Sequence, residues 1–219
     1  TKQMFRLIKI ESSKLFYKLK SWLGPMLIMI LVLTAFPLSI DISQFDLEKF
    51  YFSIIVVSLL MTSFLATEGM FEEDFEDGSL EQEYLIEHDF YKVVLSKIFV
   101  YVCFIGLPIA FIGAIFSFAN GVAIGSFMNV FLSLSLSNLL LFNLFAFGNA
   151  LSINKGAMLG VLTTLPLALP VIILLGTAIR SIQYGNGFLE IISMMIGAGF
   201  LISAIMPLII STTLKTHID

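Results

Sequence analysis

Long apolar runs alternate with short polar segments along this chain, and each run is long enough to cross a bilayer. A membrane-spanning helix needs about 20 mainly apolar residues. Backbone polar groups in lipid must be satisfied within the segment, and none of the runs alternates with period two, so each should be an α-helix. We therefore expect six spans, at residues 23–40, 50–67, 98–118, 124–147, 157–179 and 188–210.

Residues 3–22, which precede the first span, should form an amphipathic helix in the headgroup layer. At about 100° per residue, the apolar side chains gather within an arc of about 120° and most lysines lie outside it. The pair Gly24-Pro25 should end this helix and start the first span. The segment is too charged for the apolar region of a signal peptide. We expect an orienting anchor, and an elbow that also gates a lateral opening is the alternative.

Composition agrees with these spans. Hydrophobic residues make up 58% and charged residues 13%, half of the about 25% that a soluble domain carries. Six spans, one N-terminal helix and short loops use up the whole length. The chain is therefore predicted to be an all-α integral membrane protein with one transmembrane domain over residues 1–219, and with no separate soluble domain.

The positions of Lys and Arg predict the orientation, because basic residues collect on the cytoplasmic side. With six spans both termini lie on one side. That side would hold ten of the twelve basic residues, and only Lys49 and Arg180 would lie on the other. Both termini and the segment 68–92 should therefore face the cytoplasm, or a mitochondrial matrix.

Ten of the 16 acidic residues lie between Glu68 and Asp89, in a loop between two spans. A segment this polar cannot lie in hydrocarbon, so we expect it to stand in water and to contact a soluble partner there. A plain solvated acidic loop is the alternative.

Within the loop, local patterns predict a helix, a turn and a second helix. Phe71 and Phe75 form an apolar pair four residues apart on a short first helix. Asp77-Gly78 supplies the turn, since glycine takes positive φ without steric cost. The run Ser79–Gln82 fits a capping box, in which Ser79 caps the second helix and Gln82 reaches back to it.

Three prolines inside the spans, Pro108, Pro166 and Pro170, are candidate hinges. Pro166 and Pro170 are four residues apart, so both remove hydrogen bonds on the same helix face. We expect a kinked or broken helix there, and ordinary helix packing is the alternative to a moving hinge.

The fourth span carries the most polar side chains. Ser126, Asn129, Ser133 and Ser137 form one stripe, and Asn138, Asn143 and Asn149 lie off it. Such groups bond to neighbouring helices or line a wet cavity, and we favour helix–helix bonding. The small-residue ladders 106–110–114, 113–117–121 and 193–197 favour close helix packing, in part with a second copy of the chain.

Several kinds of chemistry are missing from the sequence. No acid or base lies in the middle of a span, which argues against a proton-driven carrier. No G-x-x-x-x-G-K-[ST] loop occurs, so ATP is not bound in that way. The single Cys103 excludes a disulfide framework and a cysteine metal cluster, and both histidines, His88 and His217, lie outside the spans. We expect no catalytic site, no metal site and no nucleic-acid site.

Residues 68–82 resemble the cytoplasmic signature of the heme exporter protein B (CcmB) family. In that family a Glu is followed by Leu-Phe, two acids and Asp-Gly-Ser-Leu-Glu-Gln, and the last six match Asp77-Gly78-Ser79-Leu80-Glu81-Gln82. The resemblance extends to residues 36–40, 95–97 and 106–108, and to the double proline at 165–170. It covers most of the chain.

The resemblance implies the non-catalytic membrane subunit of an ABC transporter for heme in cytochrome c biogenesis, in the bacterial cell inner membrane or the mitochondrial inner membrane. Implied partners are an ATP-binding subunit (CcmA-like) that hydrolyses ATP, membrane proteins CcmC-like and CcmD-like, a heme chaperone (CcmE-like) and a second copy of the chain. Heme is the implied cargo, not a bound cofactor. Residues implied to couple this chain to the ATPase are Glu68, Phe71, Asp74, Phe75, Asp77, Gly78, Ser79, Leu80, Glu81 and Gln82. The alternatives are an ABC exporter subunit for another substrate, and an assembly scaffold that moves no substrate.

Overall fold

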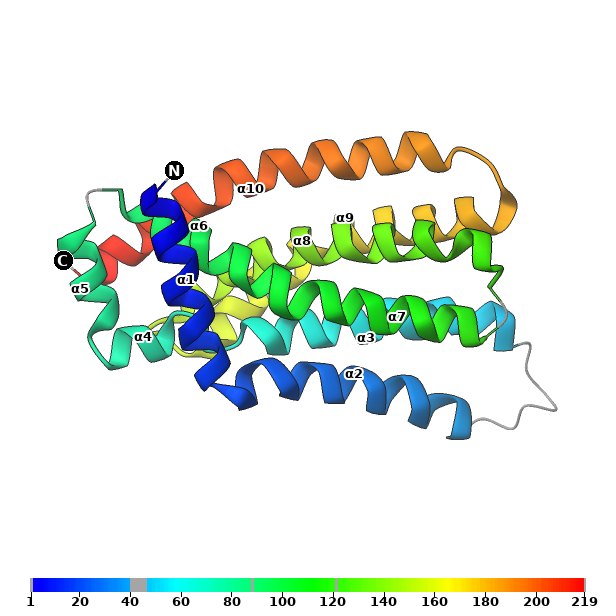
Figure 1. Cartoon of the computed structure of the whole chain (residues 1–219), viewed down its shortest axis with the longest axis horizontal. Coiled ribbons are helices and arrows are strands. Elements are labelled where there is room, and N and C mark those ends of the chain that lie inside the picture. Colours follow the sequence, from blue (N-terminus) through cyan, green and yellow to red (C-terminus); the bar gives the residue numbers. More distant parts are fainter. Residues whose placement is uncertain (1, 40–46, 88, 121, 219) are drawn as a thin grey trace.

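A computed structural model describes residues 2–39, 47–87, 89–120 and 122–218 (Figure 1). Every element within these ranges is helical. The elements are α1 (Lys2–Tyr17), α2 (Leu19–Ser39), α3 (Leu47–Thr67), α4 (Glu72–Glu76), α5 (Ser79–Ile86), α6 (Phe90–Tyr101), the π-helical turn η1 (Val102–Gly106), α7 (Leu107–Ala119), the 3₁₀ turn η2 (Ile124–Ser126), α8 (Phe127–Ser152), α9 (Ala157–Tyr184) and α10 (Phe188–Ile218).

The helices form a bundle in which both termini, α1 and the α4–α5 hairpin lie at one end (Figure 1). Among the described residues, five helical segments are long and apolar enough to span a membrane: 51–76, 90–119, 124–152, 158–184 and 188–218. A sixth is reached when α1 and α2, which meet at 62°, are counted as one bent span. The prediction of an all-α, multi-pass membrane protein is confirmed. Residue 40 of the first predicted span lies outside the described ranges.

The N-terminal helix ends earlier than the sequence predicted. α1 ends at Tyr17, and α2 begins at Leu19 and continues through Gly24 and Pro25. The prediction that Gly24-Pro25 separates the two helices is therefore wrong. A proline removes only its own hydrogen bond from a helix, and membrane helices tolerate it. The break lies instead at residue 18, directly after the helix α1, which packs against α6 and has Leu7 and Leu15 buried.

Helix α8 lies at the centre of the bundle and contacts α3, α7, α9 and α10. In its apolar window 67% of the residues are buried, against 28% in α9 and 22% in α10. The two C-terminal helices therefore present most of their apolar surface outward, to lipid or to another protein.

Asn138 and Asn143 of α8 bond this helix to its neighbours, so the expected helix–helix bonding is confirmed for these two asparagines. Asn138 accepts a hydrogen bond from Ser63 Oγ of α3 at 2.8 Å and donates one to the Gly106 carbonyl at 2.7 Å. Asn143 Nδ2 lies 3.4 Å from Ser203 Oγ of α10. In the predicted stripe, by contrast, Ser133 bonds only within its own helix, to the carbonyl of residue 129.

The third span is irregular just before Pro108. A π-helical turn over Val102–Gly106 separates α6 from α7, and such turns widen a helix and free a carbonyl for another partner. Asn138 takes up the Gly106 carbonyl. Around Pro166 and Pro170 the outcome differs, because α9 is continuous through both prolines. Of the kink or break expected there, the break is wrong, and the kink stays a prediction.

The small-residue ladders lie partly inside the bundle and partly on its outer surface. Gly106, Ala110 and Ala114 are buried within the bundle, so this ladder packs inside one chain. Gly197, by contrast, is exposed on α10, and an added Cβ there would meet nothing within 4 Å. Gly121, the last residue of the middle ladder, lies outside the described residues.

The closest helix contact joins α8 to α9 through two glycines that the sequence analysis did not single out. A Cβ built on Gly160 would lie 2.5 Å from the Gly148 carbonyl oxygen, and one built on Gly148 would lie 2.4 Å from Thr164 Cγ2. Backbone atoms cannot move aside as a flexible side chain can. The two helices can therefore approach this closely only while both positions are glycine.

We predict that Gly160→Ala destabilises the folded protein by about 1–3 kcal/mol, the usual cost of overpacking, because its methyl group meets backbone. The matched control Gly197→Ala adds the same methyl group to a helix in open space, and should leave stability unchanged or slightly higher. Thermal unfolding in detergent measures both, and equal melting temperatures for the two variants would contradict the close contact.

Candidate functional site

The acidic segment forms the hairpin α4–α5, which lies beside α1 at the end of the bundle that holds both termini (Figure 1). Two apolar side chains anchor it, since Phe71 and Leu80 are almost completely buried. The Phe71 backbone N–H donates a 2.8 Å hydrogen bond to Asn149 Oδ1 at the end of α8. The hairpin is thus fastened to the central helix of the bundle.

The turn of the hairpin has the predicted glycine but a different cap. Gly78 has φ 75°, in the left-handed region that favours glycine. Ser79 does not cap α5, because the helix already begins at Ser79. Asp77 Oδ1 instead accepts the Ser79 N–H at 2.9 Å, and this hydrogen bonding from Ser79 lowers the pKa of Asp77. The predicted capping box is therefore wrong, since the left-handed turn at Gly78 brings Asp77 to the free N–H.

A buried charge cluster lies beneath the hairpin. Asp74, Glu11 and Lys97 are 2%, 4% and 4% exposed. Lys97 Nζ of α6 donates a hydrogen bond to Asp74, lies 3.9 Å from Glu11 Oε2 and stands over the Phe71 ring at 5.5 Å. Burying charges without partners costs several kcal/mol per ion, so this cluster holds α1, α4 and α6 in one arrangement.

Lys14 completes the cluster from the side of α1. Its Nζ lies 2.6 Å from Glu83 Oε1, 3.5 Å from Glu11 Oε1 and 3.6 Å from Asp74 Oδ2. Burial raises the pKa of Glu83, and the hydrogen bond from Lys14 opposes that rise. One lysine therefore links α1 to both arms of the hairpin.

Further polar contacts lie towards the two ends of α1. Near its C-terminal end, Lys18 Nζ is 2.5 Å from Glu73 Oε2. At its N-terminal end, Gln3 and Arg6 both bind the Glu87 carboxylate. We call these contacts, together with those of Lys14, the α1 clamp.

The α1 clamp corrects only in part the expectation that the acidic segment turns to water and to a soluble partner: some acids of the segment face α1 instead of water, while Glu68, Asp77 and Glu81 are exposed. Four of its acids, Glu73, Asp74, Glu83 and Glu87, pair with residues between Arg6 and Lys18. Lys14 and Lys18, in the segment expected to lie in the headgroup layer, make three of these pairs, and Arg6 makes the fourth. Sequence spacing could not reveal this, because the partners are about 55 to 80 residues apart.

The predicted coupling residues fall into two groups. Those in the first group are buried or half-buried and position the hairpin: Phe71, Asp74, Phe75, Gly78, Ser79 and Leu80. Those in the second are exposed and free to touch another molecule: Glu68, Asp77, Glu81 and Gln82. Only the second group can form a contact surface in this conformation.

Two residues of that surface were missed in the sequence. Leu85 and Ile86, at the end of α5, are 82% and 73% exposed. Adjacent large apolar side chains on a short, polar helix are costly in water unless another surface covers them. Their signal in the sequence was the apolar pair within an otherwise acidic stretch.

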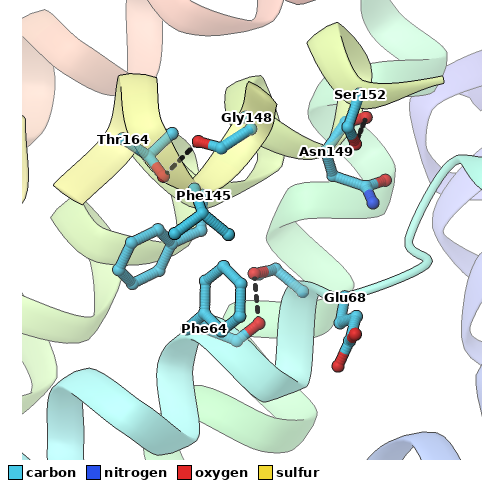
Figure 2. A pocket seen from close by; sticks show the side chains of 10 residues that line it. Phe64, Glu68, Phe145, Gly148, Asn149, Ser152 and Thr164 are labelled. Atoms are coloured by element: carbon cyan, nitrogen blue, oxygen red, sulfur yellow. Dashed lines mark hydrogen bonds between the residues drawn. The ribbon is translucent and has the colours of Figure 1, made fainter. Parts of the chain in front are cut away.

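Behind the hairpin a narrow pocket lies between α3, α8 and α9 (Figure 2). Phe64 and Phe145 meet edge to face with ring centroids 5.5 Å apart, and Glu68 and Asn149 lie on its lining. Its volume of about 30 Å³ suits roughly one water molecule. This pocket is therefore too small for a large ligand.

The three candidate hinge prolines lie away from the hairpin, inside the bundle helices. Pro108 is in the first turn of α7, and Pro166 and Pro170 are exposed on α9. The structure does not bring them into the same site as the acidic residues.

Comparison with known proteins gives one consistent result. The family model described as "CcmB protein" matches residues 4–217. Heme exporter protein B of Pseudomonas aeruginosa is 30% identical over 185 residues, 83% of each chain. The protein of that name from Haemophilus influenzae is 29% identical over 203 residues, 90% of each chain, and that from Escherichia coli K12 is 34% identical over 105 residues, 48% of each chain.

For the buried cluster we predict that Asp74→Ala destabilises the protein by about 3–5 kcal/mol, because Lys97 loses its closest partner while it stays buried. Asp74→Leu combined with Lys97→Met replaces both charges by apolar groups, and should recover much of that loss. The control Glu76→Ala removes an exposed acid from the same helix. Unfolding in detergent micelles measures all three, and a cost for Asp74→Ala no larger than that for Glu76→Ala would refute a structural role for the pair.

Proposed function

Because this chain belongs to the CcmB protein family, we propose that it is the membrane subunit of a heme exporter complex that serves cytochrome c maturation. The observation that carries this proposal is the family match over residues 4–217, which includes the spans and the whole hairpin. Relatives named heme exporter protein B cover 83% and 90% of the chain.

In this proposal ATP is hydrolysed by a separate, CcmA-like subunit, and the hairpin fits a groove on it. The exposed face of the hairpin offers apolar side chains, Leu85 and Ile86, beside the acids Asp77 and Glu81. An apolar centre with a charged rim is the usual composition of a protein contact surface. The ordered helices and the buried anchors favour such a contact over a plain solvated loop.

The bonds of the hairpin supply a route by which nucleotide-driven closure reaches the spans. The hairpin is joined to α8 through Asn149, to α6 through Lys97 and to α1 through Lys14. A displacement of the hairpin therefore moves three helices as one body, as rigid-body switches require. A loop held only by its two chain ends would bend and would pass on less of the motion.

We place the hairpin and both termini in the cytoplasm, with the chain in the bacterial cell inner membrane, or in the mitochondrial inner membrane as the alternative. The lysine-rich end of the bundle supports this orientation, since α1, the hairpin and both termini lie together there (Figure 1).

The further partners in this proposal are CcmC-like and CcmD-like membrane proteins, a CcmE-like heme chaperone and a second copy of the chain. The outward apolar surfaces of α9 and α10 supply area for such contacts and for membrane lipid. Heme is the cargo, and ATP stays on the partner subunit.

Two alternative functions can be distinguished from heme export by a transport experiment. An exporter subunit for another substrate, and a scaffold whose ATPase partner frees the heme chaperone without transport, both fit a membrane protein with a coupling hairpin. The complex reconstituted in vesicles should accumulate heme across the bilayer when ATP is added. Chaperone release without accumulation would favour the scaffold, and accumulation of a different substrate alone would favour the other exporter.

We predict that Leu85→Ser with Ile86→Ser lowers copurification of the ATP-binding subunit at least tenfold. In the proposed contact the partner would bury both apolar side chains, and burying a side chain of this size stabilises by about 1.5–3 kcal/mol. The control Leu189→Ser alters a leucine that is equally exposed, 82%, in the first turn of α10, and should copurify as the wild type does. Unchanged copurification in the double variant would exclude α5 from the contact.

For the hinge prediction, Pro166→Ala with Pro170→Ala should leave the complex assembled but slow its ATP-dependent step, because both changes restore backbone N–H donors to α9 and stiffen it. Copurification measures assembly, and the yield of holocytochrome c in cells measures coupling. Wild-type yield in the double variant would show that this helix does not act as a hinge.

A further inference from the structure

A crevice of about 420 Å³ lies between α3 and α9. Its lining comes from the first half of α3 and the second half of α9, so it lies towards the end of the bundle opposite the hairpin (Figure 1). The α3 lining is Phe52, Ser53, Val56 and Val57, and the α9 lining is Ile172, Ile173, Gly176, Ile179, Arg180 and Gln183. Small-molecule pockets have volumes of about 300–1,000 Å³, so the crevice is of that size.

The lining of the crevice is mainly apolar and includes one cationic residue, Arg180, and two neutral polar residues, Ser53 and Gln183. Among the apolar lining residues, Phe52 and Ile179 are buried, whereas Val57 and Ile173 are exposed. Arg180 is exposed, and no hydrogen bond or ion pair joins it to any residue that the structure describes. Its five N–H donors are thus available to an anion from outside the chain.

Gly176 keeps the α9 side of the crevice open. A Cβ built there would meet nothing within 4 Å, unlike those on Gly148 and Gly160, where glycine lets two helices touch. A larger side chain at residue 176 would project into the crevice without displacing the backbone.

We propose that this crevice is a transit site for the heme cargo, in which a heme propionate binds Arg180 and the porphyrin face lies on the apolar walls. The inference rests on the proposed function. Heme is a flat, mainly apolar molecule that carries two carboxylates. Its ring therefore suits the apolar lining residues, and a carboxylate suits Arg180. An Arg–carboxylate pair is bidentate and stronger than a neutral hydrogen bond.

The lining also suits passage rather than storage. None of its described residues is a His, Cys or Met, so the site holds the ring and the carboxylate but offers the iron no side-chain ligand of those kinds. A site on a transport path must bind well enough to be entered and weakly enough to be left. An iron-independent site of this kind meets both requirements.

Binding of iron-free protoporphyrin IX, followed by fluorescence, tests the site in the complete complex in lipid nanodiscs. Arg180→Gln should weaken binding roughly 10- to 100-fold, as loss of a hydrogen bond to a charged group does, and Arg180→Lys should weaken it less. The dimethyl ester of protoporphyrin IX, which has the same ring without charge, should bind weakly and respond to neither change. Equal binding of the acid by wild type and Arg180→Gln would overturn the proposal.

Gly176→Phe tests the crevice independently of charge. It should reduce binding of protoporphyrin IX at least tenfold by filling the space. Its matched control is Leu167→Phe, nine residues earlier and therefore on the opposite face of α9, which should bind as the wild type does. Unaltered binding in Gly176→Phe would place the porphyrin elsewhere.

An anionic phospholipid is the competing occupant, since its phosphate would also suit Arg180. If phosphatidylglycerol added to the nanodiscs displaces protoporphyrin IX from the wild type but not from Arg180→Gln, the crevice is a lipid site and the proposal is wrong. Undiminished binding supports the heme site.

Cytochrome c maturation in cells separates the two levels of inference. If the wild-type chain does not support maturation, the proposed function fails. If it does, and Arg180→Gln and Gly176→Phe mature cytochrome c as well as the wild type does, only the crevice proposal fails. Reduced maturation in both variants, with the ATP-binding subunit still copurifying, supports a cargo site.

Discussion

The pairing of Lys97 with Asp74 beneath the hairpin is the interaction on which the arrangement of this end of the molecule depends. Both charges are removed from water, and neither can remain so alone. Glu11 and Lys14, contributed by α1, share the cluster. These buried charges can pair only if α1, α4 and α6 meet at one place. The pairing therefore fixes the positions of the N-terminal helix, the hairpin and the third span relative to one another.

A second constraint acts inside the bundle, where buried polar side chains need hydrogen-bond partners. The asparagines of α8 meet it by bonding α3, the π-helical turn, α10 and the segment before α4. The central helix is therefore connected to both the spans and the hairpin. Contacts of this kind make the hairpin part of the bundle, and a force applied to it acts on the spans.

The two ends of α9 use glycine for different purposes. Near the hairpin, Gly160 allows backbone contact with α8, and the space that remains there is about one water in size. Towards the other end, Gly176 leaves the crevice open beside Arg180. The lack of a side chain therefore has opposite effects at the two positions. Gly160 faces the backbone of Gly148 and allows close helix packing, whereas Gly176 faces open space and leaves the crevice unfilled.

Helical spans, the acidic hairpin with its glycine turn and the family signature could all be read from the sequence, because they depend on local composition and short-range spacing. The start of α2, the cap on Ser79 and the partners of the acids could not. Gly24-Pro25 was predicted to be a helix break, and Lys14 and Lys18 were predicted to lie at lipid headgroups. A sequence pattern reports only local spacing and polarity, so it cannot show a partner that is distant along the chain. The pair Leu85 and Ile86 was visible in the sequence, but only the fold showed that it is exposed, with no described residue covering it. The sequence by itself therefore determined that this is a helical membrane protein with an acidic hairpin. The tertiary structure alone decided which charges are buried together, since ion pairs form between residues that the chain brings together from far apart.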